Sequence, residues 1–137
     1  MIKDLVYNKA ASIEKFINRV KEVYDNNYDN LQNYIKLDSI ILNIQRASES
    51  SIDLAMHIVA DEKLGIPQNS WDAFDILESN NILDKELANK MKAMVGFRNI
   101  ALHDYESINI KVVQIIIEEH LYDFEEYMAS LNKYMNR

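Results

Sequence analysis

Residues 31–64 read LQNYIKLDSIILNIQRASESSIDLAMHIVADEKL, a segment without glycine or proline. Its apolar side chains recur at near-helical spacing, at Leu37, Ile41, Ile44, Ala47, Leu54 and Ile58. Such a periodicity over a long segment is typical of one long helix, or of two nearly collinear helices. The middle of the segment, Ala47–Ser51, is small and polar, which allows a neighbouring helix to approach closely.

Further helices are predicted on both sides of this segment. Apolar spacing indicates a helix over about residues 2–24, which ends at the Asn- and Asp-rich segment 25–30. Another helix is predicted over about 84–102, with an aspartate as its N-cap, and the last over about 109–134. The last helix places apolar and other large side chains at alternating spacings of four and three, as in a near-antiparallel bundle: Ile110, Gln114, Ile117, Leu121, Phe124, Met128, Leu131 and Met135.

A short helix is predicted between these, at about residues 70–78. Gly65 and Pro67 interrupt the chain before it. Ser70 then resembles an N-cap and Asp72 an acidic residue of the first turn. Together the segments predict an all-α, single-domain bundle of about five helices over residues 1–137.

The composition supports this fold class and excludes several kinds of chemistry. The 137 residues include two Gly, one Pro and no Cys, so turns are few and strand-rich sandwiches or barrels are disfavoured. Without cysteine there is no disulfide, no thiolate zinc site and no cysteine nucleophile. The apolar runs are far shorter than the ~18 residues of a membrane span, and the N-terminus resembles no signal peptide, so we expect a cytoplasmic protein.

Arg98 occupies an unusual position on the helix predicted over 84–102. At ~100° per residue, it lies within an apolar stripe about 80° wide. The members of this stripe are Leu87, Met91, Met94, Arg98, Ala101 and Tyr105. A guanidinium keeps its charge, and burying it unpaired costs several kcal/mol, so it requires a carboxylate, a bound anion or a water-filled cleft.

His103 is the second candidate for chemistry. It lies about 140° around an ideal helix from Arg98, so the two side chains cannot share one face by spacing alone. Either the chain bends near His103, or two protomers pool their side chains. Asn99 lies one turn before His103 and could orient its ring. Residues 84–103 contain four Lys or Arg against two acidic residues, giving +2 in a chain of net charge −7, so this segment is the plausible seat for a phosphate backbone.

The segment MVGFRNIALHDY, residues 94–105, resembles the signature of the HepT-like branch of the HEPN superfamily: Arg, four residues, His, one residue, Tyr. The flanking sequences also resemble the family. They are LNIQRASESSIDLA at 42–55, LGIPQNSWDAFDIL at 64–77, and the last helix at 108–131. The resemblance therefore covers nearly the whole chain.

This resemblance implies the toxin of a type II or type VII-like toxin–antitoxin pair, a ribonuclease that uses no metal and no cofactor. Two protomers would form a composite cleft, in which Arg98 binds the scissile phosphate of RNA and His103 transfers a proton. The antitoxin would be a minimal nucleotidyltransferase, MNT, which adenylylates Tyr105. No DNA or membrane partner is expected.

Other interpretations remain open at this point. The chain could be a non-catalytic module that binds a nucleotide or a nucleotidyltransferase partner, or its main event could be its own adenylylation. Arg98 could form a structural ion pair, His103 could complement a helix dipole, and Tyr105 could serve packing.

Two other groups of polar residues are given structural interpretations. Glu49, Asp53 and His57 form an i, i+4 series that is interpreted as a polar stripe rather than a metal site, because a carboxylate-bundle site needs Glu-x-x-His on two helices. His120 is predicted to be a solvated residue.

Overall fold

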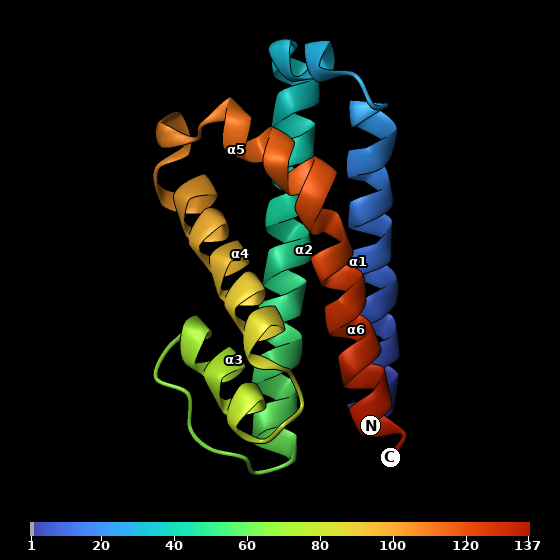
Figure 1. The fold of residues 1–137 in the computed structure, drawn as a ribbon, viewed down its shortest axis with the longest axis vertical. Helices are drawn as coiled ribbons and strands as arrows, with labels where there is room; N and C mark the ends of the chain where they lie inside the picture. Colours follow the sequence, from blue (N-terminus) through green and yellow to red (C-terminus); the bar gives the residue numbers. More distant parts are fainter. Residues whose placement is uncertain (1) are drawn as a thin grey trace.

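The computed structural model describes residues 2–137, which form helices and no strands (Figure 1). The all-α prediction is confirmed. The elements in chain order are α1 (Ile2–Tyr24), η1 (Tyr28–Gln32), α2 (Tyr34–Asp61), α3 (Ser70–Ser79), α4 (Lys85–His103), η2 (Tyr105–Ser107), α5 (Ile110–Ile115), η3 (Ile116–His120) and α6 (Leu121–Met135). None of the helices within residues 2–137 combines the length and apolarity that a membrane crossing requires.

The long helix α2 lies at the centre of the bundle and contacts α1, α3 and α4 (Figure 1). It is one uninterrupted helix, and Asn33 caps its N-terminus by accepting a hydrogen bond from the backbone N–H of Lys36. In its small polar middle, Ala47, Ser48, Ser50 and Ser51 are buried. There Ser48 and Ser51 donate to the carbonyl oxygens one turn before them, so their hydroxyls are satisfied within the helix while neighbouring helices pack closely.

The start of α3 differs by one residue from the prediction. Asn69, not Ser70, is the N-cap, and its side chain accepts from the backbone N–H of Asp72. The carboxylate of Asp72 in turn accepts from the backbone N–H of Gln68. Asparagine caps at least as well as serine, and here it occupies the extended position that precedes the helix. Ser70 is thereby the first helical residue, and its hydroxyl is free to accept a hydrogen bond from Arg98 of α4. The cap predicted for α4 is confirmed at Asp84.

The last predicted helix is interrupted. Residues 116–120 form the π-helical turn η3, so a single regular helix over 109–134 is not what the chain adopts. A π turn inserts one residue and rotates the side chains that follow it. Within this turn, Glu118 accepts a hydrogen bond from the hydroxyl of Tyr24 on α1. Burial of this phenol, together with Glu118, raises the pKa of Tyr24 to about 12.

Tyr127 provides a test of the packing of α6 against α2. Its ring is fully buried, and its hydroxyl donates to the carbonyl oxygen of Ser51 at 2.8 Å. We expect Tyr127→Phe to lower the free energy of unfolding by about 1 kcal/mol, the usual contribution of one such bond. Tyr122→Phe is the matched control, because that side chain is 64% exposed. Urea unfolding at one protein concentration measures both, and equal stability of the two variants would contradict the expectation.

Candidate functional site

Three of the four predicted site residues lie on α4, and the fourth follows it. Arg98, Asn99 and His103 are all helical, and His103 is the last residue of α4. The chain then passes through Asp104, whose backbone N–H still donates to the carbonyl of Ile100, into the short turn η2. Because Arg98 and His103 belong to one continuous helix, a bend does not bring their side chains together within one chain.

Arg98 points toward α3. Its Nη2 donates to Ser70 Oγ at 3.3 Å, and its Nε is buried without a hydrogen-bond partner. Within residues 2–137 no carboxylate lies within 4.0 Å of this guanidinium, so the structural ion pair considered for Arg98 is absent from that part of the chain. The side chain therefore holds its positive charge in the helical stripe of the core residues Met94 and Ala101 without an ion-pair partner in the described part of the chain.

His103 is exposed at the C-terminal end of α4. In the part of the chain that the structure describes, its ring makes no hydrogen bond, and Asn99 one turn earlier makes none to it. The imidazole is thus open to a partner or substrate from outside the chain. The orienting role predicted for Asn99 stays a prediction.

Tyr105 is held by a residue that the sequence did not single out. Its hydroxyl donates a hydrogen bond to the carboxylate of Asp38 on α2, across 67 positions of the chain. Burial, then the hydrogen bond and charge of Asp38, and then the charge of Glu106 raise the pKa of Tyr105 to about 12. The side chain nevertheless remains 42% exposed. No periodicity or motif indicates Asp38, because only the fold brings the start of α2 to the turn after α4.

An open apolar groove lies between α4 and the segment α5–η3. Its apolar lining includes Met94, Phe97, Ile100, Val112, Ile115 and Ile116. Three of these, Ile100, Val112 and Ile115, are 44–46% exposed. Large apolar side chains that are half open to water and gathered on one face are characteristic of a surface that another protein covers.

The groove ends in a charged cluster that corrects the prediction for His120. This residue is not simply solvated, because its Nδ1 lies 2.9 Å from the carboxylate of Asp123. Asp123 is almost fully buried, and Lys90 approaches it to 3.8 Å. His120 is the last residue of the π turn η3, an interruption that a regular helical periodicity does not reveal.

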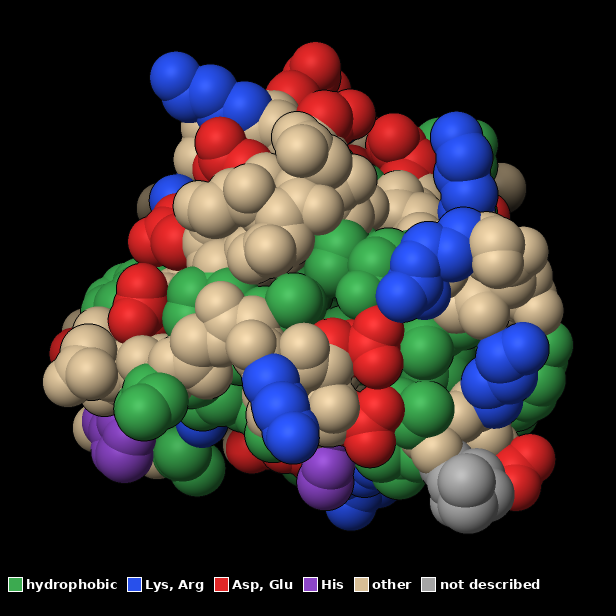
Figure 2. Space-filling model, turned by 90° about the horizontal axis from the view of Figure 1, so that it is seen from below, with side chains coloured by type: hydrophobic (Ala, Val, Ile, Leu, Met, Phe, Trp, Pro, Cys, Tyr) green, Lys and Arg blue, Asp and Glu red, His purple; other side chains and the backbone are tan. Residues whose placement is uncertain are grey.

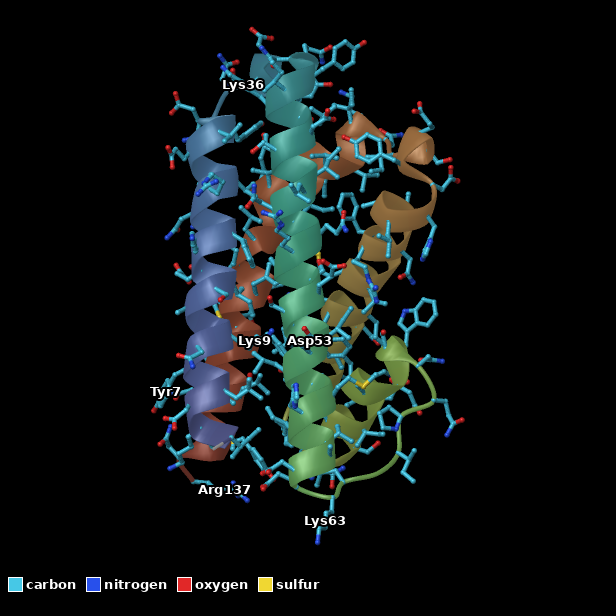
Figure 3. All side chains as sticks on the ribbon, turned by 180° about the vertical axis from the view of Figure 1, so that it is seen from behind. Tyr7, Lys9, Lys36, Asp53, Lys63 and Arg137 are labelled. Atoms are coloured by element: carbon cyan, nitrogen blue, oxygen red, sulfur yellow. The ribbon has the colours of Figure 1, made fainter. Side chains whose placement is uncertain are left out.

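The i, i+4 series on α2 has a structural partner. Asp53 forms an ion pair with Lys9 of α1 at 3.4 Å, and Figure 3 shows these two side chains pointing toward one another. Its other members, Glu49 and His57, belong to no group of three such side chains that could hold a metal within residues 2–137.

Figure 2 views the bundle from the end where both termini lie, where basic and acidic side chains are interspersed rather than gathered by sign.

Comparison with known proteins places the chain in a family. A profile described as ribonuclease HepT-like matches residues 13–131. The chain belongs to the HepT-like ribonuclease family. An mRNA nuclease HepT from Shewanella oneidensis is 42% identical over 127 residues, which are 93% of this chain and 96% of that protein. The resemblance seen in residues 94–105 and their flanks is thereby confirmed.

Solved structures of HepT-like proteins agree with this. A tri-AMPylated HEPN toxin of Shewanella oneidensis in complex with MNT antitoxin superimposes with a TM-score of 0.91 at 41% identity, over 95% of this chain and 98% of that one. A toxin–antitoxin complex with AMP-PNP gives a TM-score of 0.91 at 40% identity, over the same shares of the two chains.

Proposed function

We propose that Arg98 and His103 are the catalytic pair with which this HepT-like ribonuclease cleaves RNA. The observation that carries the proposal is the guanidinium of Arg98: within residues 2–137 its buried Nε has no hydrogen-bond partner, and no carboxylate lies within 4.0 Å of it. A phosphate is the ligand that best matches this planar fork of donors. An anionic polymer laid across α4 would supply the counter-charge that the described residues do not.

The chemistry follows from the two side chains. Arg98 would bind the scissile phosphate and stabilise the charge that develops on its oxygens. His103, as an exposed imidazole, would take the proton from a ribose 2′-hydroxyl or return one to the leaving oxygen. Attack by the 2′-hydroxyl then leaves a 2′,3′-cyclic phosphate. Asn99 would orient the imidazole once the site is filled.

The active form is proposed to be a homodimer. Arg98 and His103 lie about 140° apart around α4 in one chain, so a cleft lined by both requires a second copy. The groove between α4 and α5–η3 supports this proposal, because its exposed Ile100, Val112 and Ile115 provide an apolar surface for association.

The biological role is proposed to be that of a toxin that an MNT antitoxin neutralises in the cytoplasm. The Shewanella oneidensis relative is a tri-AMPylated toxin bound to such an antitoxin. Tyr105 is the proposed acceptor here, because it is exposed beside the motif helix. An adenylyl group at this position would stand next to His103 and obstruct access of RNA.

A second candidate function is a non-catalytic module that grips a nucleotide phosphate with Arg98. The absence of a hydrogen bond that orients the exposed His103 within residues 2–137 favours this alternative. The experiment below separates the two functions, because only a nuclease consumes RNA.

RNA cleavage by variants tests the catalytic pair. In the presence of EDTA we expect the wild-type protein to digest total RNA, with product ends that are 2′,3′-cyclic phosphates. His103→Ala should lower the rate by roughly 10²–10⁴-fold and Arg98→Ala by roughly 10²–10³-fold. His57→Ala and Arg19→Ala are matched controls on other helices and should cleave as the wild type does. Equal digestion by all variants, or by none, would contradict the proposal.

Light scattering at micromolar concentration tests the dimer. The wild-type protein should have twice the mass of the 16.0 kDa chain. The double variant Val112→Glu, Ile115→Glu places two charges in the groove and should be a monomer with little nuclease activity. Ile66→Glu is the control, because Ile66 is also exposed but lies in the loop before α3, far from α5 (Figure 1). A wild-type monomer would exclude a shared cleft.

Intact-mass measurement tests the acceptor. Co-expression of the wild-type protein with its antitoxin should add adenylyl groups to the chain. Tyr105→Phe removes the hydroxyl and should abolish the additions, while Tyr122→Phe, another exposed tyrosine, should keep them. Persistence of the additions in Tyr105→Phe would place the modification on another residue.

A further inference from the structure

The phenol of Tyr105 and the carboxylate of Asp38 form a pair that is open to solvent. Asp38 lies near the start of α2, two residues after Lys36, which Figure 3 labels at that end of the helix. Ile35, one turn before Asp38, is 82% exposed, and Tyr105 itself is 42% exposed. A partner protein can therefore reach the hydroxyl of Tyr105 while Asp38 still accepts its hydrogen bond.

We propose that Asp38 is the general base for adenylyl transfer to Tyr105. This inference rests on the proposed function, in which Tyr105 is the acceptor. Asp38 would accept the phenolic proton while the phenol oxygen attacks the α-phosphorus of a nucleoside triphosphate that the antitoxin carries. Asp38 thus contributes a catalytic group from the toxin to a reaction whose nucleotide is held by the other protein.

The step balances as a phosphoryl substitution. The bond between the Tyr105 oxygen and the α-phosphorus forms, and the bond from the α-phosphorus to the oxygen that bridges to the β-phosphate breaks. Pyrophosphate leaves with the electron pair of the broken bond. The phenolic proton moves to Asp38 and from there to water, which restores the carboxylate for the next cycle.

A base is needed because the phenol holds its proton firmly. The pKa of Tyr105 is raised to about 12, so at neutral pH almost every phenol carries its proton. The proton must therefore leave during the attack. A general base has to lie within hydrogen-bonding distance of the proton that it removes, and Asp38 already accepts that hydrogen bond.

The neighbouring acid Glu106 does not compete for this role. It influences Tyr105 through its charge alone, and within residues 2–137 it forms no hydrogen bond with the phenol. Glu106 is consequently a matched control. Glu106→Gln removes one negative charge near Tyr105, as Asp38→Asn does, but leaves the acceptor of the phenolic hydrogen bond in place.

A purely structural role for the same contact is distinguishable. If the hydrogen bond only fastens the turn after α4 to α2, Asp38→Asn retains an acceptor oxygen of the same shape and should leave the reaction unchanged. An amide is not a base at neutral pH, however, so general-base catalysis should be lost in this variant.

The experiment is a single-turnover reaction of the purified toxin with its antitoxin and ATP, followed by intact mass. We expect Asp38→Asn to slow the first adenylyl addition by roughly 10²-fold, Glu106→Gln to react at the wild-type rate, and Tyr105→Phe not to react. Where a second group is added to the first, its acceptor is a ribose hydroxyl rather than the phenol. Later additions should then proceed at the wild-type rate in Asp38→Asn.

A rescue experiment guards against a folding defect. Asp38→Ala removes both the base and the acceptor, and added formate should restore part of the first addition if a carboxylate is what the reaction lacks. Thermal unfolding of each variant is measured alongside. Rescue by formate in a chain that remains folded supports proton transfer, whereas no rescue in a folded chain counts against it.

The outcomes separate the inference from the function on which it rests. Undiminished additions in Tyr105→Phe would overturn both the acceptor and the role of Asp38. If Tyr105→Phe does not react but Asp38→Asn reacts at the wild-type rate, the role of Asp38 alone would be overturned. Equal slowing of first and later additions in Asp38→Asn would indicate impaired docking and would also overturn it.

Discussion

An unneutralised positive charge on the apolar side of α4 is the constraint on which the site depends. Arg98 follows the helical register of Met91 and Met94, both buried, and its Nε is buried without a hydrogen-bond partner among residues 2–137. Placing a permanent cation there is costly unless an anion arrives. The protein meets part of the cost with the hydroxyl of Ser70, and the remainder of the guanidinium's hydrogen-bonding capacity is available to a ligand.

The rest of the bundle keeps α4 in place. The central helix α2 contacts α1, α3 and α4, and the buried phenol of Tyr127 ties α6 to it. Because Asn69 caps α3, the hydroxyl of Ser70 is free to accept a hydrogen bond from Arg98. The choice of N-cap at the start of α3 thus determines the hydrogen-bond partner of the guanidinium. The end of α4 and the turn η2 remain on the surface, where His103 and Tyr105 are accessible.

Much of this arrangement could be predicted from the sequence because it depends on local periodicity. The approximate boundaries of α1 and α4 and the placement of Arg98 within an apolar stripe follow from helical spacing, and the Asp84 cap follows from its residue type. The existence of α2 was predicted in the same way, but it begins and ends three residues inside the predicted segment 31–64, because η1 (Tyr28–Gln32) precedes it. The π turn η3 could not be predicted, because side-chain spacing does not encode a single inserted residue. Asp38 was missed for a different reason: its contact with Tyr105 arises only from tertiary packing, and nothing near Asp38 in sequence indicates a function.

The bond between Tyr105 and Asp38 also determines what esterification of the phenol would do to the chain itself. A phosphodiester at that oxygen has no proton to donate and brings a negative charge beside Asp38 and Glu106. The attachment of the turn after α4 to α2 would then become a repulsion between like charges. A covalent modification at this position would thus release the turn after α4 from α2 as well as fill the space in front of His103.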